Sequence, residues 1–230
     1  FVFRGTFWNR ANTRSCYRAG CRFYRDPVQS AGTFFHETFD PVIYKDKKIK
    51  LKIRVMVNLI RITELTDIRL QKLLSLYEEA FPEEERRNAK QLKRLISEKP
   101  EMYFNAIETN GVLSGLFIYW DMQDFYYLEH LAVFTSMRNL KVGQQVLDYI
   151  AEHLDGTRLL EVEPTTDEMT TRRVNYYRRN GYEILDKTYM QPSYDEDIEV
   201  GNLWIMGSRK SDRLQEFIER IKQVAYWENR

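Results

Sequence analysis

Cysteine is nearly absent from this chain. Of its 230 residues two are cysteine, Cys16 and Cys21, and none follows Met56. Residues 56–230 therefore cannot hold a disulfide framework, a thiolate metal site or a cysteine nucleophile. The two cysteines themselves are separated by four residues, with no further cysteine or histidine close by, which is weak evidence for zinc.

Long apolar stretches are also missing. The longest uncharged runs, such as Leu113–Trp120, have the length of a strand and fall well short of the roughly 18–20 residues that span a bilayer. No apolar segment typical of a signal peptide stands near the start. The sequence thus predicts a cytoplasmic protein without a membrane partner.

Several catalytic motifs are absent as well. The chain has no G-x-G-x-x-G, no P-loop, no G-x-S-x-G and no H-E-x-x-H, and the histidines of residues 56–230 are His130 and His153. These absences argue against a Rossmann dinucleotide site, a serine-hydrolase nucleophile and a catalytic zinc, so no metal is expected. What remains is a mechanism that uses a bound cofactor, backbone amides and a few side chains.

Charge is divided unevenly along the chain. Residues 1–55 carry 12 basic and 4 acidic side chains, whereas residues 56–230 carry 23 basic and 30 acidic ones. The basic segment has three interpretations: sequence upstream of a true start at Met56, an arm for nucleic acid or an acidic membrane surface, or a targeting peptide, against which its acidic residues argue. We expect disorder or poor packing for residues 1–55. The acidic remainder disfavours nucleic acid as its partner.

The apolar patterns of residues 56–230 alternate between strand and helix periods. Strands are predicted at 57–62, 103–108, 113–121, 125–134, 158–163, 182–190 and 202–206, and helices at 70–81, from 88, at 143–154, at 170–180 and from 212. Asn110-Gly111 predicts a tight hairpin, and Asn88 with Gln91 predicts a capping box. The order indicates a mixed α/β sheet covered by helices on both faces. It forms a domain at 56–210, and an amphipathic helix at 211–230 packs on it.

Three neighbouring features near the middle of the chain predict an anion site. The strand Phe125–Phe134 is nearly all apolar except at Glu129-His130, the basic loop Met137–Gly143 follows it, and a helix begins at once. The first N–H groups of a helix have no intrahelical partner, and the helix dipole adds partial positive charge there. Arg138 and Lys141 add two full charges, so a diphosphate is the expected ligand.

At these residues the sequence resembles the GNAT superfamily of acyl-CoA-dependent N-acyltransferases. Leu131-Ala132-Val133 and the following Arg138–Gly143 (RNLKVG) are similar to the strand and the Arg/Gln-x-x-Gly-x-Gly/Ala loop of that family. Asn175–Tyr182 (NYYRRNGY) is similar to its later helix and turn, and the resemblance covers roughly residues 56–210. The sequence departs from the family at Lys141, which replaces the inner glycine and would either crowd a pyrophosphate or bind it as a point charge.

The resemblance implies a fold and a reaction. The fold is a mixed, mostly antiparallel and twisted sheet of six to seven strands flanked by helices, with central strands that splay apart to hold acyl-CoA. The reaction is transfer of an acetyl group from acetyl-CoA directly to a primary amine, without an acyl-enzyme. The resemblance also implies which residues bind the cofactor. The pantetheine arm would contact Leu131, Val133 and Asn175. The diphosphate would contact Arg138, Asn139, Leu140, Lys141, Val142, Gly143 and Gln144.

Two side chains are the predicted catalytic groups. Glu129 would take the proton of the amine, because an alkylammonium with a pKa of about 10.4 is mostly charged at neutral pH; alternatively, it is a structural carboxylate that faces an arginine. Tyr177 would stabilise the departing thiolate, or else is a packed aromatic. Tyr127 would share the face of Glu129, while His130 would point the opposite way in a regular strand and is a structural histidine.

The acceptor amine is not identified by the sequence. The family places its pocket at the first two helices and the loop between the last strands, which here carry Pro82-Glu83-Glu84-Glu85 and Asp195-Glu196-Asp197-Ile198-Glu199. These runs would attract a cationic amine or are simply solvated charges. Two other functions stay open: a non-catalytic CoA-binding or regulatory domain, and a nucleic-acid adaptor that acts through residues 1–55. The protein is predicted to be a monomer or a homodimer.

Overall fold

A computed structural model describes residues 57–195 and 199–229. The expectations for residues 1–55 lie outside these ranges. The strands are β1 Val57–Arg61, β2 Met102–Thr109, β3 Val112–Asp121, β4 Phe125–Val133, β5 Thr157–Val162, β6 Glu183–Asp186, β7 Met190–Pro192, β8 Glu199–Asn202 and β9 Trp204–Gly207. The helices are α1 Leu70–Ala80, α2 Ala89–Glu98, α3 Val142–His153, α4 Glu168–Arg179 and α5 Leu214–Ile221, with short turns η1 Glu83–Glu85, η2 Thr135–Met137, η3 Lys222–Tyr226 and η4 Trp227–Asn229.

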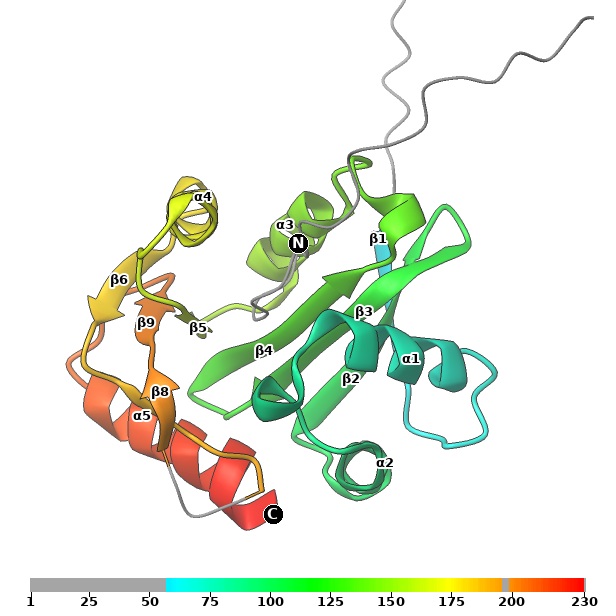
Figure 1. The fold of residues 1–230 in the computed structure, drawn as a ribbon, viewed down its shortest axis with the longest axis horizontal. Helices are drawn as coiled ribbons and strands as arrows, with labels where there is room; N and C mark the ends of the chain where they lie inside the picture. Colours follow the sequence, from blue (N-terminus) through cyan, green and yellow to red (C-terminus); the bar gives the residue numbers. More distant parts are fainter. Residues whose placement is uncertain (1–56, 196–198, 230) are drawn as a thin grey trace, which may run out of the picture. The chain divides into compact units, whose positions relative to one another are not determined.

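One mixed sheet organises the domain. Its seven strands follow the order β1-β2-β3-β4-β5-β9-β6, and β7 and β8 form a separate two-stranded ladder. Neighbouring strands run antiparallel except β4 and β5, which are parallel. Figure 1 shows this sheet with α1 and α2 on one side and α3 and α4 on the other. The predicted fold class is confirmed.

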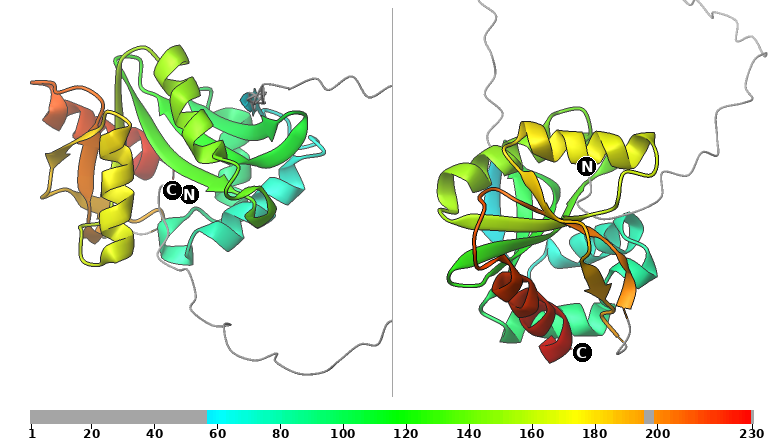
Figure 2. Two further views of the ribbon diagram at one scale, coloured as in Figure 1. Left: turned by 90° about the horizontal axis from the view of Figure 1, so that it is seen from above. Right: turned by 90° about the vertical axis from the view of Figure 1, so that its left-hand side faces the viewer.

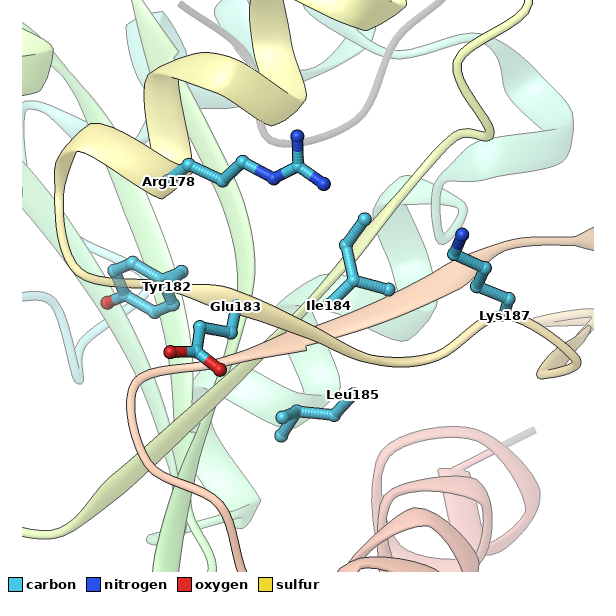
Figure 3. Close-up of a pocket in the computed structure, with 6 residues that line it drawn as sticks. All are labelled: Arg178, Tyr182, Glu183, Ile184, Leu185 and Lys187. Atoms are coloured by element: carbon cyan, nitrogen blue, oxygen red, sulfur yellow. The ribbon is translucent and has the colours of Figure 1, made fainter.

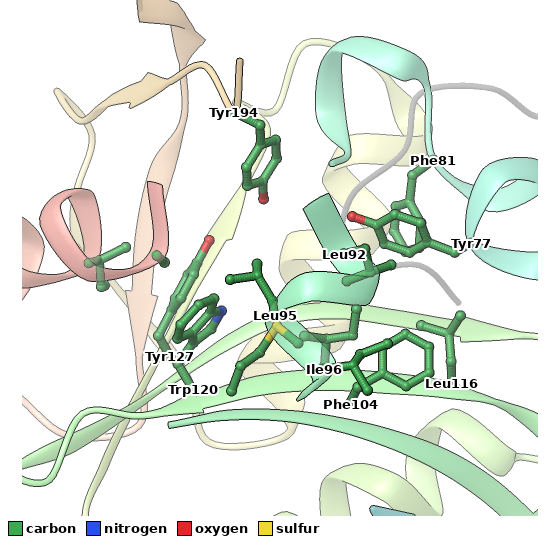
Figure 4. Close-up of a cluster of buried hydrophobic side chains, with 14 of the residues drawn as sticks. Tyr77, Phe81, Leu92, Leu95, Ile96, Phe104, Leu116, Trp120, Tyr127 and Tyr194 are labelled. Atoms are coloured by element: carbon green, nitrogen blue, oxygen red, sulfur yellow. The ribbon is translucent and has the colours of Figure 1, made fainter. Parts of the chain in front are cut away.

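Each face of the sheet buries its own apolar core. The core under α1, α2 and α5 includes large side chains from all three helices and from β2 to β5 (Figure 4), among them Leu73, Leu92, Phe104, Trp120, Tyr127 and Ile221. The core under α3 and α4 is separate and includes Phe117, Leu128, Leu131, Val146, Val174 and Tyr177. The sheet is therefore covered on both faces, as the alternation of strands and helices predicts.

Local signals in the sequence set several element ends. Asn110 and Gly111 both have positive φ, at 50° and 78°, as a tight hairpin turn between β2 and β3 requires. Asn88 caps α2 by accepting a hydrogen bond from the backbone N–H of Gln91. The reciprocal half of the predicted capping box is wrong, because the Gln91 side chain donates instead to the carbonyl oxygens of Tyr194 and Asn229. Long-range partners therefore outcompete the local one.

The C-terminal part differs in detail from the prediction. The single strand expected at 182–190 is divided into β6 and β7, because the Asp186 carboxylate accepts hydrogen bonds from the backbone N–H and hydroxyl of Thr188 and forms a turn. The last helix extends past α5 through η3, which is a π-helix, and through η4. Phe217, Ile218 and Ile221 of α5 are buried, as its apolar stripe predicts.

One glycine allows two central strands to approach closely. A Cβ atom on Gly115 of β3 would lie 2.1 Å from the carbonyl oxygen of Ala132 in β4. Real Cβ atoms do not come that near to a backbone oxygen, so only glycine fits at this point without a backbone shift. The contact lies opposite the end of β4 at which the expected cofactor site begins.

Candidate functional site: the divergence of the two parallel strands

The two parallel strands pair over only part of their length. Phe125 to Leu128 of β4 are in register with Thr157 to Leu160 of β5. Both strands lie wholly within the described residues, and β4 runs on to Val133 and β5 to Val162 without further pairing to each other. We call the region where they diverge, beyond Leu128 and Leu160, the wedge. Figure 2 shows the two strands and the helices behind them from two further sides.

A β-bulge lies where the wedge begins. In the pairing of β3 with β4, Ile118 is opposite His130 but Tyr119 is opposite Leu128, so Glu129 is the extra residue. Glu129 and His130 therefore face the same side of the sheet, and the prediction that His130 points the opposite way is wrong. The ring of His130 packs edge-on against Phe81, and its Nε2 lies 3.1 Å from the carbonyl oxygen of Glu85.

The backbone of β4 beyond the bulge faces the wedge. The N–H of Phe134 donates to the carbonyl oxygen of Ser114 in the β3 chain segment. Because backbone groups alternate in direction along an antiparallel strand, the polar groups of Leu131 and Val133 point away from β3 and toward the wedge. The side chains of both residues are buried in the core under α3 and α4. The main-chain groups of both residues therefore line the wedge.

The loop that follows β4 is shaped by two residues with positive φ. Asn139 has φ 69° and Lys141, which precedes the first residue of α3, has φ 58° and ψ 24°. That left-handed region is the one that glycine adopts without strain. The lysine that replaces the family's glycine therefore keeps the glycine-like backbone path, and its own side chain is exposed.

This loop leads into the N-terminus of α3. Gln145 donates its N–H to the carbonyl oxygen of Lys141. The N–H groups that precede it in α3, from Val142 to Gln144, have no intrahelical acceptor, as the start of a helix dictates. Successive amides around left-handed residues form a concave anion site. The Gln144 side chain has another role, because its amide donates to Asp148 and to Asn180 at the end of α4.

The two predicted residues of α4 lie in different surroundings. Tyr177 is 1% exposed, and its ring lies between those of Tyr176 and Tyr182. Burial raises the pKa of the Tyr177 phenol well above its ordinary value, and the nearby Arg173 guanidinium opposes this. Asn175 is exposed. Residues two apart on a helix point in different directions, so the structure does not bring these two side chains together.

Glu129 is buried in an ion pair. Its carboxylate receives hydrogen bonds from the Arg87 guanidinium at 2.6 Å, the Tyr194 hydroxyl at 2.9 Å and the Trp120 indole N–H at 3.0 Å. The side chains of Glu129 and Arg87 are both fully shielded from solvent. These contacts match the alternative interpretation of Glu129 as a structural carboxylate that faces an arginine. The role of Glu129 as a base stays a prediction.

Arg87 links this carboxylate to several elements. Burial by itself lowers the pKa of its guanidinium, but the charge of Glu129, its hydrogen bond and the phenols of Tyr194 and Tyr77 together more than offset this, and the pKa is raised. The guanidinium also donates to the carbonyl oxygen of Ala225 and stacks 4.3 Å from the ring centre of Tyr194. Its backbone N–H donates to the hydroxyl of Tyr77. Arg87 was not found by sequence reasoning, because it lies in a short charged connection with no periodic pattern.

A second buried carboxylate stands on the other side of the wedge. Glu161 of β5 accepts hydrogen bonds from the hydroxyls of Tyr189 at 2.6 Å and Tyr226 at 3.0 Å. The hydroxyl of Tyr226 lies 3.2 Å from that of Tyr127. Figure 4 shows how the hydroxyls of Tyr127 and Tyr194 approach the same region. A usable signal exists for Glu161, since it interrupts an apolar strand just as Glu129 does.

The predicted acidic acceptor segments are only partly visible. η1 holds Glu83 to Glu85, and the side chain of Asn88 behind it lies 3.4 Å from the carboxylate of Asp195. Residues 196–198 lie outside the described ranges. The described part thus brings the connection between α1 and α2 next to the segment that follows β7.

A surface cavity lies elsewhere, along β6 and the end of α4. It measures about 640 Å³ and is shown in Figure 3. The basic groups of two residues, Arg178 and Lys187, extend on the same side of β6 there. None of the predicted site residues lines it; the lining consists of Arg178, Tyr182, Glu183, Ile184, Leu185 and Lys187.

Two kinds of feature are missing from the described residues. No helix among them is both long and apolar enough to cross a membrane. Over the same ranges, no three side chains of histidine, cysteine, aspartate or glutamate gather in a way that would hold a metal ion.

Comparison with known proteins bears directly on this arrangement. The model of the acetyltransferase (GNAT) family matches residues 70–182, which include the wedge, the loop and α4. Residues 70–182 therefore form a GNAT acetyltransferase domain. A putative GNAT acetyltransferase from Bacteroides thetaiotaomicron is similar to it, with 28% identity and a TM-score of 0.68 over 74% of this chain and 98% of that one.

Other solved GNAT structures are more distant. One from Elizabethkingia anophelis, with acetyl-CoA bound, has 13% identity and a TM-score of 0.45 over 69% of this chain and 100% of that one. Naa50 of Arabidopsis thaliana, in complex with the bisubstrate analogue CoA-Ac-MVNAL, has 20% identity and a TM-score of 0.43 over 68% and 98%. No curated protein matches the sequence.

Proposed function

We propose that this GNAT domain transfers an acetyl group from acetyl-CoA to a primary amine. One observation carries the proposal: β4 and β5 stop pairing after Leu128 and Leu160, beside a loop that leads into the N-terminus of α3, where the first N–H groups have no intrahelical acceptor. An extended ligand with a diphosphate at one end fits this combination, because a free strand edge pairs with its arm and the amides receive its charge. The residues present therefore fit acetyl-CoA as a substrate.

The proposal divides the contacts by chemistry. Main-chain groups of Leu131 and Val133 would bind the pantetheine arm, and the amides of residues 139–144 would bind the diphosphate. Lys141 would add a point charge, because its side chain is exposed beside those amides. Arg138 would act likewise, and Asn175 would contact the arm from α4.

Tyr177 is proposed to serve the departing sulfur. A thiol has a pKa of about 8.5, below that of a phenol. Because burial raises the pKa of Tyr177 further, its hydroxyl stays protonated at neutral pH and acts best as a hydrogen-bond donor to the thiolate. The phenol thereby stabilises negative charge as the C–S bond breaks.

Glu129 is proposed to receive the amine proton. It stands at the bulge where the wedge begins, so an amine that reaches the thioester from the side of α2 and η3 would pass it. Arg87 holds the carboxylate ionised. Proton transfer to Glu129 then requires the amine to take the place of one of its three donors.

The test uses the full chain and two measurements. Calorimetry with coenzyme A should show saturable binding, and thiol release from acetyl-CoA should depend on an added primary amine. Titration without heat would refute the site, since the wedge and loop would then hold no CoA. Cytoplasmic location and a monomeric or homodimeric state stay predictions from the sequence.

A non-catalytic CoA-binding domain is the second candidate. The observation in its favour is the enclosure of Glu129, which is bonded to Arg87 and Tyr194 beneath the segment that contains Ala225. Under this alternative, CoA binds but no amine in a broad panel releases thiol. Turnover with any amine would exclude it.

A further inference from the structure

The wedge has a buried carboxylate on each of its strands. Leu128 and Leu160 are the last residues at which β4 and β5 pair with each other. The next residue along each strand is a glutamate, Glu129 or Glu161. Both side chains face the core beneath α1, α2 and α5, because their partners Tyr194, Tyr189 and Tyr226 all belong to that core. The proposed function uses Glu129 and leaves Glu161 without a task.

Phenol groups connect Glu161 to the strand opposite. The hydroxyl of Tyr226 lies within hydrogen-bond distance of both carboxylate oxygens of Glu161, at 3.0 and 3.2 Å. The same hydroxyl lies 3.2 Å from that of Tyr127, which β4 carries two residues before the bulge. Either hydroxyl can donate in this contact. The result is a continuous hydrogen-bonded chain from Tyr127 through Tyr226 to Glu161.

An unusual helical turn holds Tyr226 in this position. Tyr226 ends η3, a π-helix, and such turns occur frequently at functional sites. Hydrogen bonds from α2 and from the residue before its cap hold this segment. Arg87 donates to the carbonyl oxygen of Ala225, and Gln91 and Arg94 donate to that of Asn229. Tyr226 itself is fully buried. It lies beyond residues 70–182, so the family match assigns it nothing.

We propose that Glu161 is a second proton acceptor for amine acetylation and that Tyr226 positions the chain that reaches it. The inference rests on the proposed function. Before attack, the alkylammonium gives one proton to the oxygen of Tyr127, Tyr127 passes its own proton to Tyr226, and Tyr226 passes its proton to Glu161. Both phenols end as they began, Glu161 ends protonated, and the amine is left neutral. Its lone pair then bonds to the acyl carbon, the C–S bond breaks, and the thiolate leaves with that electron pair and takes up the second proton of the nitrogen.

Several charged or titratable groups surround this chain. Tyr189 donates to Glu161 from the segment before β7. Tyr194 stacks on Tyr226 with ring centres 4.8 Å apart. Its hydroxyl donates to Glu129, so Tyr194 contacts both the hydrogen-bonded chain and the ion pair of Arg87 and Glu129. A bound amine would therefore meet an ionised Glu129 held by arginine and a Glu161 held by phenols. Phenol donors favour the charged form of a carboxylate less strongly than a guanidinium does, which suits Glu161 to accept a proton.

The experiment compares two nucleophiles that differ in charge. Ethylamine is an alkylammonium at pH 7 and must lose a proton, whereas hydroxylamine is already neutral at that pH. Thiol release from acetyl-CoA is measured with each, at pH 7 and at pH 10, for the full chain and for Glu161→Gln. With ethylamine at pH 7 we expect a loss on the order of 100-fold, the usual scale of general base catalysis. With hydroxylamine, or with ethylamine at pH 10, the loss should shrink to a few-fold.

A matched pair of variants tests the hydrogen-bonded route from Tyr127 to Glu161. Tyr226→Phe and Tyr189→Phe each remove one phenol from the same carboxylate, but only the first interrupts the route to Tyr127. Tyr226→Phe should reproduce the nucleophile and pH pattern of Glu161→Gln, and Tyr189→Phe should not. Calorimetry with coenzyme A checks that each variant is folded.

The outcomes separate the two proposals. Equal losses with ethylamine and hydroxylamine, or identical behaviour of the two tyrosine variants, would refute the proton route to Glu161. The proposed acetyltransferase function would be unaffected by that result. If the unaltered chain releases thiol with neither nucleophile and with no amine of the wider panel, the proposed function is itself wrong and this inference is lost with it.

Discussion

The two sides of the wedge are built in different ways. On the side of α3 and α4, the expected cofactor contacts other than Asn175 come from one continuous stretch, residues 131–144, and consist largely of main-chain groups. On the side of α2 and η3, side chains from five separate segments meet; they are Arg87, Glu129, Glu161, Tyr194 and Tyr226. The first side depends on backbone path and the second on side-chain identity.

That contrast determines how each side tolerates change. The loop keeps its left-handed residue although lysine stands where the family has glycine. The buried polar cluster has less freedom, because a charge in a dry interior that loses its partner pays the full desolvation cost. Substitutions of single side chains should therefore harm the side of α2 and η3 more.

The largest expected effect is at Arg87. Arg87→Met would leave Glu129 buried without its guanidinium, which typically destabilises a protein by about 3–5 kcal/mol. Denaturant unfolding would measure the change. Arg94→Met is the matched control, because Arg94 donates to Asn229 from a partly exposed position and should cost far less. Equal losses for both variants would contradict the contrast between the two sides.

Gly143→Glu tests the other side through binding. Gly143 lies in the first turn of α3, and a carboxylate there would stand against the diphosphate. We expect the affinity for coenzyme A to fall at least about 1000-fold, which corresponds to about 4 kcal/mol. Calorimetry measures it, and denaturant unfolding checks that the variant is folded. Unchanged binding would show that the diphosphate lies elsewhere.

Tyr177→Phe should separate chemistry from binding. If its hydroxyl donates to the departing thiolate, turnover should fall on the order of 100-fold while the affinity for acetyl-CoA changes little. Steady-state kinetics together with calorimetry supply both numbers. Tyr176→Phe on the same helix is the control. A similar fall in turnover there would point to packing of α4 as the cause.

Lys141→Gly should have the smallest effect, with opposite signs for stability and binding. Glycine relieves the left-handed strain at Lys141, so the unfolding free energy should rise by at most about 1 kcal/mol. Loss of the point charge should weaken coenzyme A binding by less than about 10-fold. Asn139→Gly, at the other left-handed position, should gain less stability because asparagine tolerates that region. Tighter binding in Lys141→Gly would mean that lysine crowds the pyrophosphate.

The main-chain side could be predicted from sequence because its signals are local. A strand, a basic loop and a helix start follow one another within twenty residues, and Asn110-Gly111 and Asn88 each act on neighbours. The structure accordingly reproduces the sheet, the hairpin and most element positions.

The side-chain side could not be predicted in the same way. A bulge at Glu129 reverses the direction expected for His130, and alternation alone contains no sign of an extra residue. Arg87 lies 138 residues from Ala225 in the sequence and Tyr226 lies 99 residues from Tyr127, and no periodicity connects them. Gln91 shows the same conflict, since its distant partners displaced a local cap.

The glycine at position 115 has a consequence for the opposite edge of β4. Any larger residue there would meet the carbonyl oxygen of Ala132, and β4 could yield only by moving away from β3, toward β5. The width of the wedge therefore depends on residue 115, which does not itself line the wedge. An alanine at this position would push β4 toward β5 and narrow the wedge without changing any residue that lines it.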